Sequence, residues 1–108
     1  MAIRDIQSAD FDAVVAGSPW AIVCFTRPKC PWCARVAEPL AELAATVSDN
    51  VAVVKIDREA SPELAQRFSV RSFPVLILFK NGSIREASAG GGDNTLEWIE
   101  SLKELAEA

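Results

Sequence analysis

Apolar and polar positions follow two different periods along the chain, and the changes of period mark the expected elements. Short apolar runs rich in β-branched and aromatic residues predict buried strands. These runs are residues 20–26 (WAIVCFT), 51–57 (VAVVKID) and 75–79 (VLILF). After the first run, apolar residues recur at helical spacing, which predicts a helix from Pro31 to about Asp49 with a kink at Pro39.

Turn and cap residues predict the remaining boundaries. Ser8 is a candidate N-cap for a helix that ends at Gly17, and Ser61 is one for a short helix that ends near Ser69. Residues 2–6 alternate weakly and could form a short edge strand.

The last third of the chain predicts a hairpin and a final helix. Asn81 and Gly82 form a strong hairpin signal, so residues 83–88 should return antiparallel to the strand before them. Asn94, with Glu97 three residues later, resembles a capping box for a helix that extends to Leu105.

The resulting order, β-α-β-α-β-α-β-β-α, predicts an α/β protein with a central mixed sheet flanked by helices on both faces. The chain has 108 residues, no repeat and no linker, so we expect one domain over residues 1–108.

Charge and hydropathy exclude several classes of protein. The net charge of -4 and a pI near 4.8 disfavour a nucleic-acid binder. The most continuous apolar stretch, residues 75–79, is too short to cross a membrane, so we expect no membrane association. Residues 1–6 carry neither a basic leader nor an apolar segment, which predicts no secretory signal, although a signal could have been removed from a mature form.

The cysteine and histidine counts narrow the chemistry. Three cysteines cannot all pair within the chain, and the absence of histidine removes the usual zinc ligand and the usual general base. Cys30 and Cys33 lie where a buried strand meets the next helix. The helix N-terminus, with Lys29 and Arg27 nearby, should stabilise a Cys30 thiolate. This pattern predicts a nucleophilic Cys30 and a resolving Cys33 one turn into the helix.

Three other uses of these cysteines stay open. A zinc site lacks ligands, since only Cys24 could join the pair and no histidine is present. An iron-sulfur cluster bridging two chains is geometrically possible. Two unrelated structural cysteines are disfavoured by their position at the start of the helix.

The sequence resembles the thioredoxin family over almost its whole length. The resemblance rests on AIVCFTRPKCPWCARVAEPLAEL, VAVVKID and RSFPVLILFKNG. It implies the thioredoxin fold and a cis peptide bond between Phe73 and Pro74 beside the CxxC pair. In the family, the residue before this proline pairs with an extended substrate segment, so the resemblance places Phe73 and Pro74 in the substrate platform. Lys29, Pro31 and Trp32 are expected to contact substrate as well.

The chain departs from the family pattern at several positions. Lys29 replaces the usual tryptophan, and Pro31-Trp32 between the cysteines is similar to the Cys-Pro-aromatic-Cys of glutaredoxins. Cys24 occupies the position of the family's buried Asp, and Val53 that of its Lys partner. Pro39 falls one place later than the family's helix proline, which suggests a local bulge. Replacement of a buried ion pair by apolar residues need not harm the fold, but it removes a proton acceptor for Cys33.

The remaining cysteine, the tryptophans and two of the cations have mainly structural interpretations. Cys24 is expected to be a buried apolar core residue rather than a third redox group. Trp20 and Trp98 are expected to pack in regular elements, and Trp32 to be exposed at the substrate face. Lys55 and Arg58 are expected on the solvated surface.

The resemblance implies a monomeric, cytoplasmic thiol-disulfide oxidoreductase that reduces protein disulfides with no bound cofactor and no metal. Its partners would be disulfide-containing proteins and a flavin-dependent thioredoxin reductase that supplies electrons from NADPH. A glutaredoxin-like, glutathione-dependent activity is the first alternative, although the usual TVP around the proline is absent. A non-enzymatic binding module, or a dimer bridging an iron-sulfur cluster, is the second.

Overall fold

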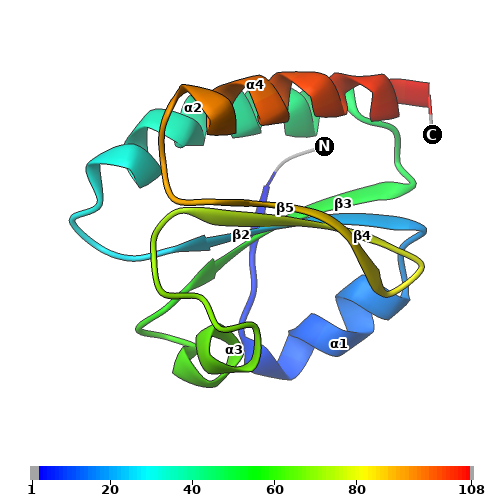
Figure 1. Cartoon of the computed structure of the whole chain (residues 1–108). Coiled ribbons are helices and arrows are strands. Elements are labelled where there is room, and N and C mark those ends of the chain that lie inside the picture. The colour runs from blue at the N-terminus through cyan, green and yellow to red at the C-terminus, as the bar shows by residue number, and fades with distance from the viewer. Residues whose placement is uncertain (1–2, 108) are drawn as a thin grey trace.

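A computed structural model describes residues 3–107 and shows a five-stranded mixed sheet between two layers of helices (Figure 1). The predicted α/β class and the predicted element order are confirmed, and a 3₁₀ helix follows the last α-helix. The strands are β1 (Arg4–Asp5), β2 (Trp20–Thr26), β3 (Val51–Asp57), β4 (Val75–Lys80) and β5 (Ser83–Ala89). The helices are α1 (Ser8–Ala16), α2 (Pro31–Thr46), α3 (Pro62–Arg67), α4 (Asp93–Ser101) and the 3₁₀ helix η1 (Leu102–Glu107).

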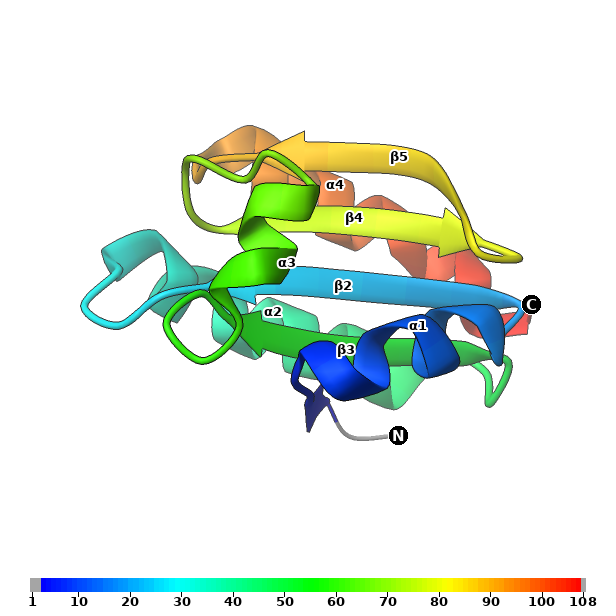
Figure 2. The ribbon, with the colours of Figure 1, turned by 90° about the horizontal axis from the view of Figure 1, so that it is seen from below.

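The sheet has the strand order β1-β3-β2-β4-β5. β1, β3 and β2 run parallel to one another, whereas β4 and β5 are antiparallel additions. α2 and α4 cover one face, and α1 and α3 cover the other (Figures 1 and 2). Both faces of β2 and β4 are therefore buried, which explains why these strands are continuous apolar runs.

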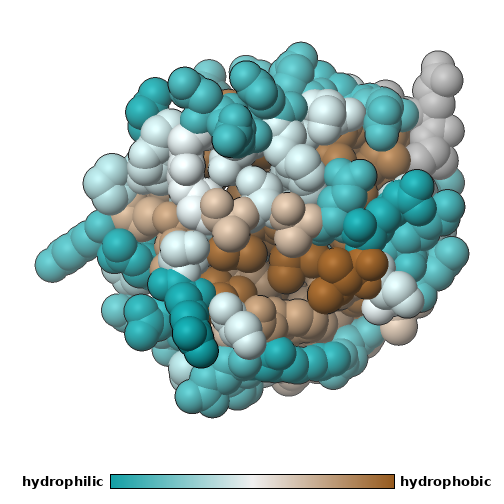
Figure 3. Space-filling model, in the orientation of Figure 1, coloured by the Kyte–Doolittle hydropathy of each residue, from teal (hydrophilic) through white to brown (hydrophobic). Residues whose placement is uncertain are grey.

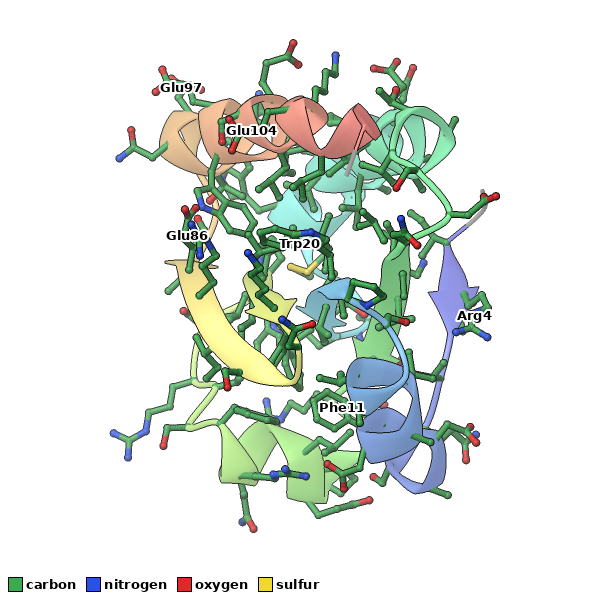
Figure 4. All side chains as sticks on the ribbon, turned by 90° about the vertical axis from the view of Figure 1, so that its right-hand side faces the viewer. Arg4, Phe11, Trp20, Glu86, Glu97 and Glu104 are labelled. Carbon is green, nitrogen blue, oxygen red and sulfur yellow. A yellow bond between two sulfur atoms is a disulfide. The ribbon has the colours of Figure 1, made fainter. Side chains whose placement is uncertain are left out.

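Each face of the sheet has its own apolar core. The core under α2 and α4 contains Ile22, Leu40 and Ile99, with Trp20 and Trp98 packed against it as predicted. The core under α1 and α3 contains Phe11, Phe25 and Leu64 among its buried residues. Phe11 points from α1 into the molecule in Figure 4. Since alternate residues of β2 enter opposite cores, the strand joins the two layers.

Two predicted N-caps do not act as expected. Gln7, not Ser8, is the N-cap of α1, and the Ser8 hydroxyl donates to the Glu63 carboxylate instead. Ser61 is the N-cap of α3, yet its side chain makes no bond to that helix. The Ser61 hydroxyl oxygen accepts a hydrogen bond from the Ser8 backbone N–H at 3.1 Å. Ser61 therefore satisfies the first donor of α1 and ties two helices together.

The final helix also begins differently from the prediction. Gly92 is its N-cap, with no side-chain cap bond, so the predicted Asn94–Glu97 capping box is wrong. α2 ends at Thr46 rather than near Asp49, where Val47 is already extended. Pro39 lies inside α2, as expected, and the kink and bulge predicted there stay predictions.

The Asn81–Gly82 hairpin is confirmed. Both residues have positive φ angles, 50° and 85°, as a tight turn of this kind requires. The register between β4 and β5 shifts after the Leu78–Glu86 pair, so that Phe79 lies opposite Ile84. This shift leaves Arg85 as an extra residue in β5, which is a β-bulge.

The edges of the sheet differ in length. β1, expected within residues 2–6, spans only two exposed residues, whereas β5 spans seven that are largely exposed. Among the residues that the structure describes, no helix is long and apolar enough to span a membrane.

Candidate active site

The candidate site lies at one end of the sheet, where the register brings several connections together. Thr26, the last residue of β2, lies opposite Asp57, the last residue of β3. Val75, the first residue of β4, lies opposite Ala89, the last residue of β5. The segments that follow β2, β3 and β5, and the segment that precedes β4, therefore gather at the same end (Figure 1).

The cysteine pair lies at the start of α2. Cys30 is the N-cap and Cys33 lies in the first turn, with Pro31 at the first helical position. The two residues form a disulfide with 5.2 Å between their Cα atoms. The Cys33 backbone N–H donates to the Cys30 sulfur at 3.2 Å. In the dithiol state, that donor and the positive end of the helix favour a Cys30 thiolate over a thiol.

The Phe73–Pro74 peptide bond is cis, as the family resemblance implies. Cys30 is 8% exposed, and its sulfur lies 3.7 Å from the Phe73 carbonyl oxygen. The backbone just before the proline is therefore next to the reactive sulfur. Phe73 is half-buried, and the guanidinium groups of Arg27 and Arg58 lie 5.9 and 5.8 Å from the centre of its ring.

Lys29 occupies an exposed turn just before Cys30. Its φ angle of 56° lies in the left-handed region, which costs a residue with a side chain about 1–2 kcal/mol. The turn thereby directs the chain from β2 into α2 and holds a positive charge one residue from the nucleophile. The position of Lys29 agrees with a substrate-contacting role, which stays a prediction.

Trp32 is not simply exposed at the substrate face, as the sequence suggested. It is half-buried, and the Arg35 guanidinium lies 4.2 Å from the centre of its ring. A Cβ atom added at Gly91 would overlap the Trp32 side chain, so the indole packs directly on the Gly91 backbone. The loop after β5 therefore holds Trp32, and only a glycine allows so close an approach.

A cavity of about 610 Å³ opens beside the disulfide. Cys30, Cys33 and Cys24 line it together with three cationic side chains, and no carboxylate of the described residues does so. Cys24 is 1% exposed and belongs to the core, which confirms its predicted burial. Burial raises the pKa of the Cys24 thiol from 9.0 to about 12, and the nearby Lys55 ammonium lowers it in part. Cys24 therefore cannot replace the missing carboxylate as a proton acceptor.

The position of Lys55 differs from the sequence prediction, which placed it on the solvated surface. It lies opposite Cys24 in the β2–β3 register and lines the cavity, so it is not merely surface. Its ammonium group is 3.8 Å from the Asp5 carboxylate. Lys55 lies on the same face of β3 as Val53, two residues earlier, and this spacing could have identified it from the sequence. Arg58, also expected on the surface, is exposed but lies over Phe73.

The arrangement defines a class of protein. A disulfide at a helix N-terminus, next to a cis-proline, can exchange with another disulfide through a mixed-disulfide intermediate. The described residues contain no group of three or more cysteine, aspartate or glutamate side chains placed to hold a metal.

Comparison with known proteins identifies the family. The sequence profile described as Thioredoxin matches residues 2–104. The thioredoxin of Rhodospirillum rubrum is 31% identical over 103 residues, which cover 92% of this chain and 98% of that protein. The thioredoxin of Haemophilus influenzae is 36% identical over 89 residues, 82% of this chain and 83% of that protein. The chain also matches Bloodstream-specific protein 2 of Trypanosoma brucei brucei at 35% identity, but spans 18% of its length.

Solved structures agree. Plasmodium falciparum thioredoxin superimposes with a TM-score of 0.82 at 26% identity, over 92% of this chain and 98% of that one. A mutant thioredoxin from Halobacterium salinarum NRC-1 superimposes with a TM-score of 0.79 at 28% identity, over 96% of this chain and 93% of that one. The chain belongs to the thioredoxin family, and together with the Cys30–Cys33 disulfide this makes it a thiol-disulfide oxidoreductase.

Proposed function

We propose that the protein reduces disulfides in other proteins, with Cys30 as the nucleophile and Cys33 as the resolving cysteine. The observation that carries this proposal is the Cys30 sulfur, which accepts a helix N–H and lies beside the Phe73 carbonyl. A substrate segment bound along the Phe73–Pro74 backbone would bring its disulfide to that sulfur.

The reaction proceeds in two exchanges. The Cys30 thiolate attacks one sulfur of the substrate disulfide, a mixed disulfide forms, and the other substrate sulfur leaves as a thiolate and takes up a proton. Cys33, deprotonated to its thiolate, then attacks the Cys30 sulfur and releases the second substrate sulfur. Two electrons pass to the substrate, and the Cys30–Cys33 disulfide remains.

The electrons would return from NADPH through a flavin-dependent thioredoxin reductase, and the protein itself would need no bound cofactor. The family membership supports this proposal. A reducing compartment such as the cytoplasm is the setting in which a dithiol of this kind stays reduced. There, the oxidised pair would be reduced again after each turnover.

Single cysteine variants test the mechanism with insulin as the substrate. Cys30→Ser should abolish reduction, and Cys33→Ser should accumulate a mixed disulfide through Cys30. Cys24→Ala is the matched control and should retain the rate. A Cys30→Ser protein that reduces insulin at the parent rate would contradict the mechanism. Faster turnover with glutathione and glutathione reductase than with NADPH and thioredoxin reductase would instead support the glutaredoxin-like alternative.

A further inference from the structure

The charges of this acidic protein are not distributed evenly. The site end comprises residues 27–35, 57–61, 69–74 and 90–93, which the sheet register brings together. It holds five of the eleven lysines and arginines but only three of the fifteen acids, Asp57, Glu59 and Asp93. The rest of the chain therefore holds six cations against twelve acids. The five cations at the site end are Arg27, Lys29, Arg35, Arg58 and Arg71.

These five side chains are exposed, and the ion pairs found among the described residues involve other cations, namely Lys55, Arg67 and Lys103. Several of the five instead lie against aromatic rings of the site. Arg27 and Arg58 lie over Phe73, and Arg35 lies over Trp32. Stacking on a ring leaves the N–H groups at the edge of a guanidinium available to a carboxylate.

A hollow of about 280 Å³ lies between α3 and the segment that precedes β4. Arg58 and Arg71 line it together with Gln66 and Ser69, and no carboxylate belongs to its lining. Arg58 also lies 5.8 Å from the centre of the Phe73 ring, so this side chain connects the hollow with the residue whose carbonyl faces the Cys30 sulfur. Its volume is several times that of one water molecule, about 30 Å³, so an acidic side chain fits with bound water.

None of the three acids at this end, Asp57, Glu59 and Asp93, lines the hollow. Asp57 accepts the Glu59 backbone N–H at 2.7 Å and so is held in the turn after β3. Asp93 begins α4, next to the loop that holds Trp32. Glu97 on α4 and Glu104 on η1 are exposed on the helical layer on the other side of the sheet from α3 (Figure 4). A cationic end on an acidic molecule attracts acidic partners and orients them.

We propose that this site prefers protein disulfides whose flanking segment carries acidic side chains, and that Arg58 and Arg71 receive those carboxylates beside the Phe73–Pro74 platform. This inference rests on the proposed function, because it names the substrate class of the same site. Lys29 and Arg27, which line the cavity beside the disulfide, add to the attraction without forming the hollow.

Three disulfide peptides of identical length test the preference, with Glu, Gln or Lys on both sides of the cysteine. The protein is reduced beforehand, and the second-order rate of its oxidation by each peptide is measured in a single turnover. We expect the Glu peptide to react about three- to thirtyfold faster than the Gln peptide, and the Lys peptide more slowly. The ratio should fall as salt is added, since the charges are exposed.

Charge variants test which residues cause the faster reaction of the Glu peptide. In Arg58→Gln/Arg71→Gln, the ratio of the Glu rate to the Gln rate should fall towards one. Arg85→Gln is the matched control, because Arg85 lies on β5 against Trp20, at the start of β2, away from the site end. This control should retain the ratio, and circular dichroism checks that all variants are folded.

The outcomes separate the two proposals. If the protein reduces the disulfide of the Gln peptide only when Cys30 is present, the proposed function stands. Equal rates with the Glu and Gln peptides would then overturn the charge preference alone. A ratio that survives in the double variant would overturn the assignment to Arg58 and Arg71. If no peptide reacts through Cys30, both proposals fail.

Discussion

Cys24 shows how a single substitution changes what a buried position can do. A carboxylate at this place could accept a proton from Cys33, as the family resemblance implies. A thiol that burial holds at a pKa of about 12 stays neutral at physiological pH and contributes packing alone. With Cys24 neutral, the charges that line the cavity beside the disulfide are cationic, and Lys55 is the one that lies opposite Cys24 in the sheet. An ammonium can favour a thiolate there, but it cannot take the proton.

The raised pKa of Cys24 predicts a loss of stability in alkali. The folded chain binds the thiol proton more tightly than the unfolded chain, so this contribution is complete below pH 9.0 and is lost as pH rises to about 12. We expect the free energy of unfolding of the oxidised protein to fall by up to about 4 kcal/mol across this window. Urea unfolding from about pH 8 upward measures it.

Cys24→Ala serves as the reference for this experiment. The chain contains no tyrosine, and its lysines are common to the parent protein and the variant. The difference between their plots of unfolding free energy against pH therefore reports the titration of Cys24. The variant should be less stable at neutral pH, because it leaves a small cavity, but should lose less stability in alkali. Parallel curves would show that Cys24 is not the group responsible.

The contact between Gly91 and Trp32 also has a testable consequence. A methyl group at Gly91 would overlap the indole, so Gly91→Ala should cost about 1–3 kcal/mol of stability, or displace Trp32. A double-mutant cycle with Trp32→Ala checks the cause. In the Trp32→Ala background, Gly91→Ala should cost much less. An equal cost in both backgrounds would mean that the glycine is needed for another reason.

At the scale of elements, the strands were more predictable than the helix ends. The runs at 20–26 and 51–57 became β2 and β3 with the expected bounds, because burial on both faces leaves an uninterrupted apolar pattern. The hydrogen bonds at the starts of α1 and α3 were missed because they join residues far apart in the chain, whereas α4 begins at Gly92 with no side-chain cap. The Ser8 hydroxyl donates to Glu63 and the Ser8 backbone N–H donates to the Ser61 hydroxyl oxygen. Both partners lie far along the chain, so no local pattern reveals these bonds.

The features of the site likewise divide into those that the sequence predicts and those that depend on contacts between distant segments. The position of Cys30 and Cys33 at a strand-to-helix junction follows from local sequence, and the cis bond before Pro74 follows from the family resemblance. The contact of Trp32 with Gly91 could not be predicted, since it needs the loop after β5 to approach the start of α2. The cationic hollow likewise combines Arg58, after β3, with Arg71, before β4.

The hairpin between β4 and β5 offers a test of turn geometry without packing. A Cβ atom at Gly82 would meet no atom within 4 Å, yet its φ angle is 85°. Gly82→Ala should therefore cost about 1 kcal/mol from backbone conformation alone. The shift of the urea midpoint measures this cost, with Ser83→Ala as the neighbouring control. A neutral Gly82→Ala would indicate that the turn relaxes to another conformation.

At the scale of the whole molecule, two cores share one sheet. The three tryptophans lie on or beside the α2–α4 side, since Trp20 and Trp98 pack on that core and Trp32 belongs to α2. Tryptophan fluorescence therefore reports one layer directly, whereas circular dichroism reports both. The shared strands predict that the layers unfold together.

Leu64→Ala tests this coupling. Leu64 is 3% exposed and packs in the core under α1 and α3, on the side without tryptophan. The substitution should cost about 2–5 kcal/mol, and the fluorescence transition should shift as far as that measured by circular dichroism. Leu40→Ala, in the core under α2 and α4, is the matched control for the same change. A fluorescence midpoint that stays in place with Leu64→Ala would show that the two layers unfold separately.

The outer strand β5 has a consequence for how copies of the protein behave when crowded together. On the face shown in Figure 3, apolar surface is visible between polar rims, and Ile84 on β5 is 56% exposed. A long free strand beside apolar surface invites edge-to-edge aggregation. The bulge at Arg85 interrupts the row of outward-facing backbone N–H and C=O groups along β5. It also places a charged residue in that row, and Glu86 follows directly. We therefore expect this irregularity to disfavour edge-to-edge pairing of copies into larger sheets at high concentration.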